Sequence, residues 1–179
     1  MVGRYFQGRS VGSADDVDVA LHELKQWEIA HLNGTWEDTT AAQTAELIRG
    51  VYGLRVEVTA IERQQSDKAI ASDTTSDQAI VSDKAIGQIK RAVADGKLVI
   101  VPTAGRKLGN PNFTAPGPLY HMLVITGYTN DGQFIVNDPG IWQGAGWQYS
   151  TGTVMNAIGD WNGGDPAHGT TTVLIVTKG

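Results

Sequence analysis

Two residues in the second half of the chain have the types and the setting that general-base catalysis requires. His121 opens an apolar run that alternates into Leu123 and Ile125, and Asp138 stands at the far end of the next apolar run. A neutral imidazole can take a proton near pH 7, and a carboxylate on its other nitrogen fixes the tautomer and stabilises the imidazolium. We therefore predict that His121 is a base and that Asp138, or the neighbouring Asn137, orients it.

The spacing of the two runs restricts how this pair can meet. Thr-Asn-Asp-Gly-Gln separates them, which indicates a β-hairpin. A symmetric hairpin centred on Asp131 would place His121 opposite Ile141, roughly 10 Å along the strand from Asp138 at about 3.3 Å per residue. A β-bulge, a twist or an asymmetric turn must close that gap. Spacing alone leaves a second interpretation open, in which His121 is an ordinary histidine beside a turn.

The other histidines have weaker chemical settings. His22 and His31 are nine residues apart, which is not the spacing of two metal ligands on one helix face, and we expect both to be partly exposed. His168 lies near Asp160 and Asp165 in a glycine-rich segment, where a metal site is conceivable but turns are the common outcome. We predict no metal and no cofactor.

The elements that must position these side chains change character along the chain. Three helices are predicted by their end signals: Ser13 to Asn33-Gly34, Thr39 or Thr40 to Gly53, and Ser82 to Gly96. Strand patterns lie at 54–58, 98–101, 121–128, 134–138 and 171–177, with a short helix after Thr151 or Thr153. Helices come first and strands mostly later, which predicts an α+β fold with N-terminal helices packed on an antiparallel sheet.

Composition limits the function classes. The chain has 179 residues, a formal charge of −5 and no cysteine. Its length predicts one domain, and its charge argues against a general nucleic-acid binder. No apolar run approaches the roughly 20 residues that a membrane-spanning helix needs. The lack of cysteine excludes disulfides, thiolate metal sites and a cysteine nucleophile within these residues.

A repeated segment at 64–82 stands apart from the rest. The motif Ser-Asp-Lys-Ala-Ile, with Gln for Lys in one copy, occurs at 66–70, 76–80 and 82–86. The offsets are unequal, so this is not a solenoid period. We interpret the segment as an exposed, duplicated insertion, with a recognition loop as the alternative.

The block His121-Met-Leu-Val-Ile-Thr-Gly-Tyr, followed by Asn137-Asp-Pro-Gly, resembles the bacteriocin-processing (double-glycine leader) cysteine peptidases and the bacterial peptidase-like domains grouped with them. The resemblance extends from about Asp15 onward, apart from the repeats, and includes Tyr149-Ser150 with the helix that follows. It implies a papain-like fold and a peptide or protein substrate. It also implies that His121 is the base and Asp138 its orienting carboxylate.

The chain departs from this family at the nucleophile. The resemblance implies a cysteine at the start of the first helix, preceded by a glutamine of the oxyanion hole, and neither has a counterpart here. We expect a single domain over 1–179 that is N-terminally incomplete, with the missing residues just before Met1, and that is inactive as it stands. The alternative is a homologue that lost its nucleophile and binds peptides without cutting them.

Two further features were expected near a substrate cleft. Trp142 and Trp147 either shield the site from solvent or pack as ordinary loop side chains, and the residues alone do not decide between these. The glycine- and proline-rich segment at 103–118 is expected to line one side of the cleft.

Overall fold

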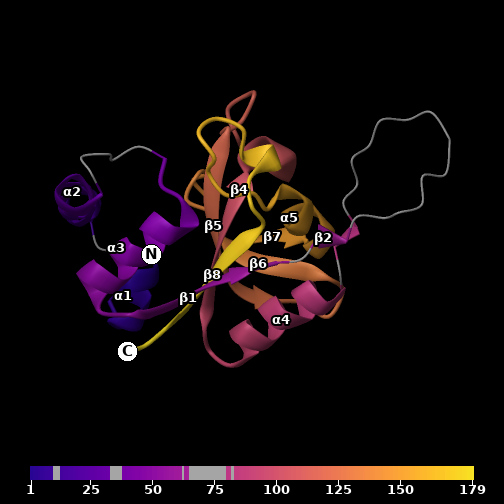
Figure 1. The fold of residues 1–179 in the computed structure, drawn as a ribbon, viewed down its shortest axis with the longest axis horizontal. Helices are drawn as coiled ribbons and strands as arrows, with labels where there is room; N and C mark the ends of the chain where they lie inside the picture. Colours follow the sequence, from indigo (N-terminus) through magenta and orange to yellow (C-terminus); the bar gives the residue numbers. More distant parts are fainter. Residues whose placement is uncertain (10–12, 33–37, 62, 65–79, 82) are drawn as a thin grey trace, which may run out of the picture.

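One antiparallel sheet of six strands, in the order β1-β8-β4-β5-β6-β7, runs through the molecule (Figure 1). The computed structural model describes residues 1–9, 13–32, 38–61, 63–64, 80–81 and 83–179. The strands of the sheet are Arg55–Ala60 (β1), Leu98–Ala104 (β4), Tyr120–Tyr128 (β5), Gln133–Asn137 (β6), Ala145–Ser150 (β7) and Thr172–Thr177 (β8).

Helices cover both faces of this sheet. The helices are Val2–Phe6 (α1), Ala14–His31 (α2), Ala41–Tyr52 (α3), Asp83–Ala94 (α4) and Thr151–Ala157 (α5), with 3-10 turns at Gly105–Leu108 (η1) and Pro166–His168 (η2). Helices α1, α2 and α3 lie on one side, and α4 and α5 lie on the other (Figure 1). The prediction of an α+β fold with helices on an antiparallel sheet is therefore confirmed.

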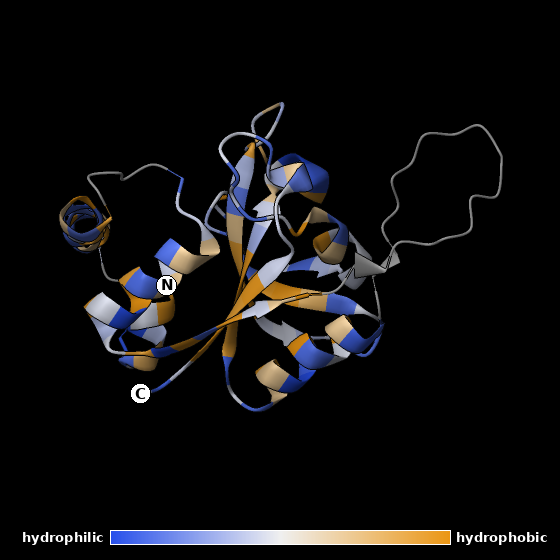
Figure 2. Ribbon diagram, viewed as in Figure 1, coloured by the Kyte–Doolittle hydropathy of each residue, from blue (hydrophilic) through white to orange (hydrophobic). Residues whose placement is uncertain are grey.

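Two apolar clusters, one on each face, explain the patterns along the central strands. In β4, Val99 and Val101 join the cluster beneath α4 and α5, whereas Leu98 and Ile100 join the cluster beneath α1 and α3. A strand that is buried on both faces has no polar face to alternate with. This is why β4 reads as a continuous apolar run, which appears in Figure 2 as hydrophobic colour at the centre of the sheet.

The starts of α2 and α3 and the end of α3 follow the predicted caps, whereas the predicted signals Asn33-Gly34 and Ser82 lie outside the described residues. The side chains of Thr40 and Gln43 form a reciprocal capping box at the start of α3, and Gly53 ends that helix at φ 62°. Ser13 and Asp16 form the same motif at the start of α2. The N-cap of α5 is Ser150 rather than either predicted threonine, because the Ser150 hydroxyl accepts from the Thr153 N–H.

Helix α2 differs from the expectation that the N-terminal helices pack on the sheet. None of its residues is buried, and Val19 and Leu21 are more than half exposed. It packs instead on α3, where the indole of Trp27 lies so close to Gly50 that a Cβ atom there would have no room. The sheet is covered by α1 and α3, and α2 lies outside them.

The repeats fall largely outside the described residues. Residues 65–79 and Ser82 are among those not described. Arg63–Gln64 (β2) and Ile80–Val81 (β3) pair as an antiparallel ladder at the two ends of the segment. Among the helices of the described ranges, none combines the length and the hydrophobicity that crossing a bilayer takes.

Candidate active site

The β5–β6 hairpin brings the ends of its two strands together with the help of a bulge. Tyr128 pairs with Phe134 near the turn, but beyond Thr126 the register shifts by one residue, so that Val124 pairs with Asn137. A bulge is one of the devices that the spacing required, and this one closes one residue of the three-residue offset between Asp138 and the position opposite His121. The chain then leaves the sheet at Asp138, whose side chain continues the face of Phe134 and Val136 beneath α4 and α5.

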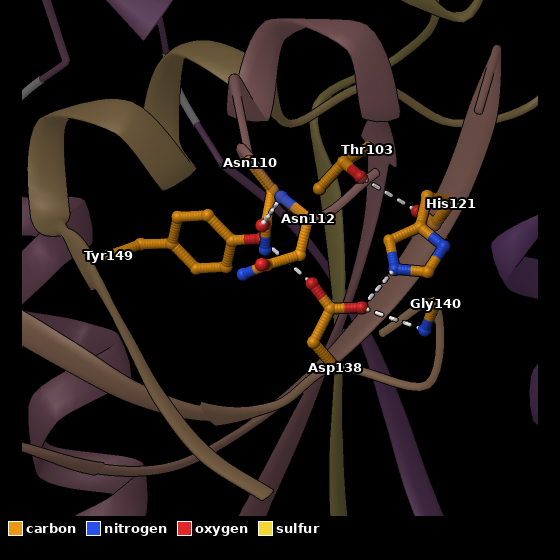
Figure 3. Close-up of polar contacts among 7 residues, drawn as sticks. All are labelled: Thr103, Asn110, Asn112, His121, Asp138, Gly140 and Tyr149. Carbon is orange, nitrogen blue, oxygen red and sulfur yellow. Dashed lines mark hydrogen bonds and ion pairs between the residues drawn. The ribbon is translucent and has the colours of Figure 1, made fainter. Parts of the chain in front are cut away.

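His121 and Asp138 meet at the end of this hairpin. The His121 Nε2 atom lies 2.7 Å from Asp138 Oδ1 (Figure 3). The Asp138 side chain has no exposed surface, and that of His121 is 11% exposed. The predicted contact is therefore present, and Asn137 does not make it: its side chain accepts from the Gly146 N–H instead.

Three donors surround the Asp138 carboxylate. Oδ1 accepts from His121 Nε2 and from the Gly140 N–H at 2.9 Å, and Oδ2 accepts from the Tyr149 hydroxyl at 2.7 Å. Burial by itself raises the pKa of Asp138, but the hydrogen bonds from His121, Tyr149 and Gly140 outweigh it and leave the pKa below its ordinary value. Asp138 is therefore an anion at neutral pH.

The ionisation of Asp138 decides which nitrogen of His121 carries the proton. An ionised carboxylate only accepts, so Nε2 must be the protonated nitrogen of the neutral ring. Nδ1 then keeps a lone pair, and no hydrogen-bond partner for it is found among the described residues. The geometry thus presents Nδ1 as a proton acceptor, which is the chemistry of a general base.

Neighbouring side chains and backbone hold the imidazole in place. Phe113, from the glycine- and proline-rich segment, meets the ring edge-on at a centroid distance of 5.4 Å. A Cβ atom at Gly140 would lie 2.9 Å from His121 Cε1, and one at Gly105 would lie 2.9 Å from His121 Cβ. The buried Thr103 hydroxyl donates to the His121 carbonyl at 2.8 Å. The imidazole therefore has little room to rotate.

Tyr149 and Asn110 belong to this site although the sequence did not single them out as polar contacts of Asp138. The Tyr149 hydroxyl accepts from Asn110 Nδ2 at 2.6 Å, and Asn110 Oδ1 accepts from the Asn112 N–H at 2.9 Å (Figure 3). Burial raises the pKa of Tyr149, so its hydroxyl stays protonated and can donate. Alternation along β7 places Tyr149 on the same face as Trp147 and could have indicated this role. However, β7 was not predicted as a strand.

A pocket of about 320 Å³ adjoins Asp138 where the loop after β6 faces α1. It is lined by Met1, Arg4, Tyr5, Arg9, Asn137, Asp138, Ile141, Trp142, Gly144 and Ala145. Trp142 is fully exposed at its edge, whereas Trp147 is partly buried and packs on the core beneath α4 and α5. Trp147 therefore packs as an ordinary side chain, and the fully exposed Trp142 does not shield the site from solvent.

The remaining candidate residues lie elsewhere. His168 Nδ1 contacts the exposed Asp165 at 2.6 Å, and the buried Asp160 accepts hydrogen bonds from backbone N–H groups and from Tyr120. Within the described ranges, no three His, Asp or Glu side chains are grouped so that they could hold a metal ion. His31 stacks on Trp27 and His22 is exposed, so neither joins the site.

Comparisons with known proteins bear on this arrangement. No curated protein matches the chain. A C39-like peptidase from Bacillus anthracis has a similar solved structure, with 12% identity and a TM-score of 0.48; the match covers 79% of this chain and 60% of that one. The chain thus spans less than two thirds of the length of that protein. The model of the Peptidase_C39 like family matches residues 6–163, so the chain belongs to the Peptidase_C39 like family.

Proposed function

We propose that this domain serves peptide-bond hydrolysis of the cysteine-peptidase type, with His121 as the general base and Asp138 as its orienting carboxylate. The observation that carries the proposal is the 2.7 Å bond between His121 Nε2 and the buried Asp138, which leaves Nδ1 free to accept a proton. Membership of a peptidase-like family supports it.

The chemistry follows from a thiol placed against Nδ1. Nδ1 takes the thiol proton, and the thiolate attacks the peptide carbonyl carbon. The imidazolium returns that proton to the leaving amine, which departs and leaves a thioester. Water then hydrolyses the thioester, releasing the carboxylic acid and regenerating the thiol. The 179 residues contain no cysteine and so supply no thiol, and we expect them to hydrolyse no peptide by themselves.

The pocket beside Asp138 suggests where a peptide would lie. Its edge carries the fully exposed Trp142 and the largely exposed Tyr5, which are flat apolar surfaces open to a ligand. Met1 lines the same pocket directly before α1. The resemblance implies a thiol at the start of the first helix, and we infer that a cysteine close to Met1 would come within reach of His121.

Installing a cysteine tests the proposal. A series of variants carries one cysteine on a short polar extension, one to four residues before Met1, and the rate of iodoacetamide alkylation is measured against pH. An activated thiol titrates at least one unit below the ordinary value of about 8.5. We expect one member of the series to do so and to lose the effect when His121→Ala is added. The control is Lys178→Cys, at an exposed position near the C-terminus. If every member titrates like this control, the proposal is wrong.

The exposed indole favours a second candidate function, the binding of a peptide without cleavage. In that case the unmodified chain binds a peptide pool, Trp142→Ala removes the binding, and no member of the cysteine series becomes reactive. A reactive cysteine that also releases a fluorogenic group from a peptide supports the hydrolytic function instead.

A further inference from the structure

Four buried or nearly buried side chains form a continuous line that ends at the base. The hydrogen bonds run from Asn110 to Tyr149 at 2.6 Å, from Tyr149 to Asp138 at 2.7 Å, and between Asp138 and His121 at 2.7 Å (Figure 3). Asn110, Asp138 and Tyr149 are at most 6% exposed. The line joins four parts of the chain: the segment after η1, strand β7, the loop after β6, and strand β5.

The direction of every bond in this line follows from its two ends. At one end the Asn112 N–H can only donate, so Asn110 Oδ1 accepts and Asn110 Nδ2 must donate to the Tyr149 oxygen. The Tyr149 proton is then directed to Asp138 Oδ2. At the other end the Gly140 N–H donates to Oδ1. The three bonds that reach the Asp138 oxygens favour the carboxylate, because a protonated oxygen would have to turn its own proton away from the donor that faces it.

The burial of Asp138 makes the Tyr149 bond matter. The carboxylate side chain has no exposed surface, so water cannot replace a lost donor at Oδ2 without movement of the structure. A buried anion that loses a hydrogen bond becomes easier to protonate. A protonated Asp138 no longer requires the Nε2–H tautomer of His121, and Nδ1 is then no longer reserved as the acceptor.

From this geometry we infer that Tyr149 and Asn110 are positioning residues that keep Asp138 ionised and thereby orient His121. The inference rests on the proposed function of His121 as the base, and it adds the two residues on which that base depends. Neither residue touches the imidazole. Both act through the carboxylate.

The substitution Tyr149→Phe tests the inference because it removes the hydroxyl and keeps the ring. The titration of Asp138 is followed by ¹³C NMR of its carboxyl carbon, and the tautomer of His121 by ¹⁵N NMR of its ring. We expect the Asp138 midpoint to rise by about one pH unit. The other ionisable groups near Asp138 are His121, which contacts it, and the Met1 amino group, Arg4, Tyr5 and Arg9, which line the adjoining pocket; all of them are unchanged in the variant.

The matched control is Tyr120→Phe. Tyr120 directly precedes His121, and its hydroxyl proton lies between the Thr39 carbonyl at 3.0 Å and another buried carboxyl group, that of Asp160, at 3.1 Å. We expect it to leave the Asp138 midpoint unchanged. Asn110→Ala is a second variant that keeps Tyr149 but frees its hydroxyl to turn, and it should raise the midpoint by less than Tyr149→Phe does.

The outcomes separate this inference from the proposed function. If Tyr149→Phe lowers the melting temperature but leaves the Asp138 midpoint where it was, Tyr149 has only a packing role and the inference is overturned. If the midpoint rises while the installed cysteines stay unreactive, the positioning role holds and the hydrolytic function is wrong. If the cysteine is reactive and the Asp138 midpoint does not move, the hydrolytic function is supported and the positioning role is wrong.

Discussion

Burial and hydrogen bonding act on Asp138 in opposite directions, and their balance sets the chemistry of the site. Burial alone would favour the neutral acid, whereas three donors on two oxygens favour the anion and keep the pKa below its ordinary value. The anion in turn fixes the proton of His121 on Nε2. The state of the base is thus decided by groups on three other segments: β7, the segment after η1 and the Pro139-Gly140 turn.

The substitution Asp138→Asn should lower the free energy of unfolding at neutral pH and make that free energy depend less on pH in the acid range. A carboxyl group whose folded pKa is lowered contributes stability that is fully present above its unfolded pKa, near 3.9, and is lost as the pH falls through the folded value. We expect the variant to lose about 1.5–3 kcal/mol of unfolding free energy at pH 7 and progressively less below pH 4. Urea unfolding between pH 7 and pH 2 measures this.

The control for this prediction is Asp165→Asn. Asp165 also contacts a histidine, His168, at 2.6 Å, but both side chains are well exposed. Water screens such a pair, so its loss should change stability little at any pH. Equal effects of the two substitutions would contradict the argument that burial gives the Asp138 bond its weight.

Gly140→Ala should displace the imidazole from Asp138. The added Cβ would lie 2.9 Å from His121 Cε1 and 3.0 Å from Phe113 Cε1, so both rings must move. We expect a loss of about 1–3 kcal/mol in unfolding free energy and a shift of the His121 ring resonances. Gly152→Ala is the control, because its Cβ would have no neighbour closer than 3.9 Å and it lies in α5, where alanine is favoured. Unchanged His121 resonances in Gly140→Ala would contradict the argument that the added Cβ displaces the imidazole.

At the scale of elements, a second buried carboxylate joins the start of α3 to the start of β5. Asp160 Oδ1 accepts from the Ala41 N–H at 2.8 Å, from the Trp161 N–H at 2.8 Å and from the Tyr120 hydroxyl at 3.1 Å. Ala41 is the first residue of α3, so Asp160 satisfies one of the N–H groups that a helix start leaves free. The contact ties residues 119 positions apart in the sequence.

Removing this carboxylate with Asp160→Ala should cost at least about 2 kcal/mol of unfolding free energy, because a charged acceptor of three donors is lost. Tyr120→Phe should cost only about 1 kcal/mol, since it removes one donor. Chemical denaturation of both variants measures the difference. An Asp160→Ala variant as stable as Tyr120→Phe would mean that the Ala41 bond contributes nothing to the anchoring of α3.

Elements with strong end signals were predictable, and those without them were not. Thr40 and Gly53 define α3 from local chemistry alone, and the apolar run from Leu98 survives as β4 because both of its faces are buried. Strand β7 has the sequence Ala-Gly-Trp-Gln-Tyr-Ser, with Gly146 at positive φ as its second residue and only a short alternation after it, and it was not predicted. Tyr149 was therefore not recognised as a partner of Asp138, because the contact depends on which face of β7 the Tyr149 side chain occupies.

Helix α2 shows the opposite case, in which a correct local prediction misleads about packing. Its capping box and helical spacing are real, yet none of its residues is buried. Periodicity reports that a helix has an apolar side, but not how much of that side another element will cover. In this fold α1 and α3 already occupy that face of the sheet, and α2 contacts the outside of α3.

At the scale of the whole molecule, the order of the strands explains why distant segments meet at the site. Strand β5 lies between β4 and β6, so the end of the β5–β6 hairpin has η1 and its following segment on one side and β7 on the other. His121, Asp138, Tyr149 and Asn110 come from these four neighbours. The site therefore forms where these neighbouring strands end, and no single motif contains it.

The same view gives a prediction about the repeats. We propose that residues 64–82 are an insertion into a single domain, because the ends of the segment pair with each other as β2 and β3. Gln64 pairs with Ile80, which is the register that a two-residue Asn-Gly turn can join.

Replacing residues 65–79 by Asn-Gly should therefore preserve the fold. Closing a loop of two residues instead of fifteen saves about 1–2 kcal/mol of chain entropy, which corresponds to a rise in melting temperature of about 2–8 °C. Thermal unfolding and the NMR resonances of His121 measure both effects. A lowered melting temperature with displaced His121 resonances would show that the repeats support the site, and the insertion proposal would then be wrong.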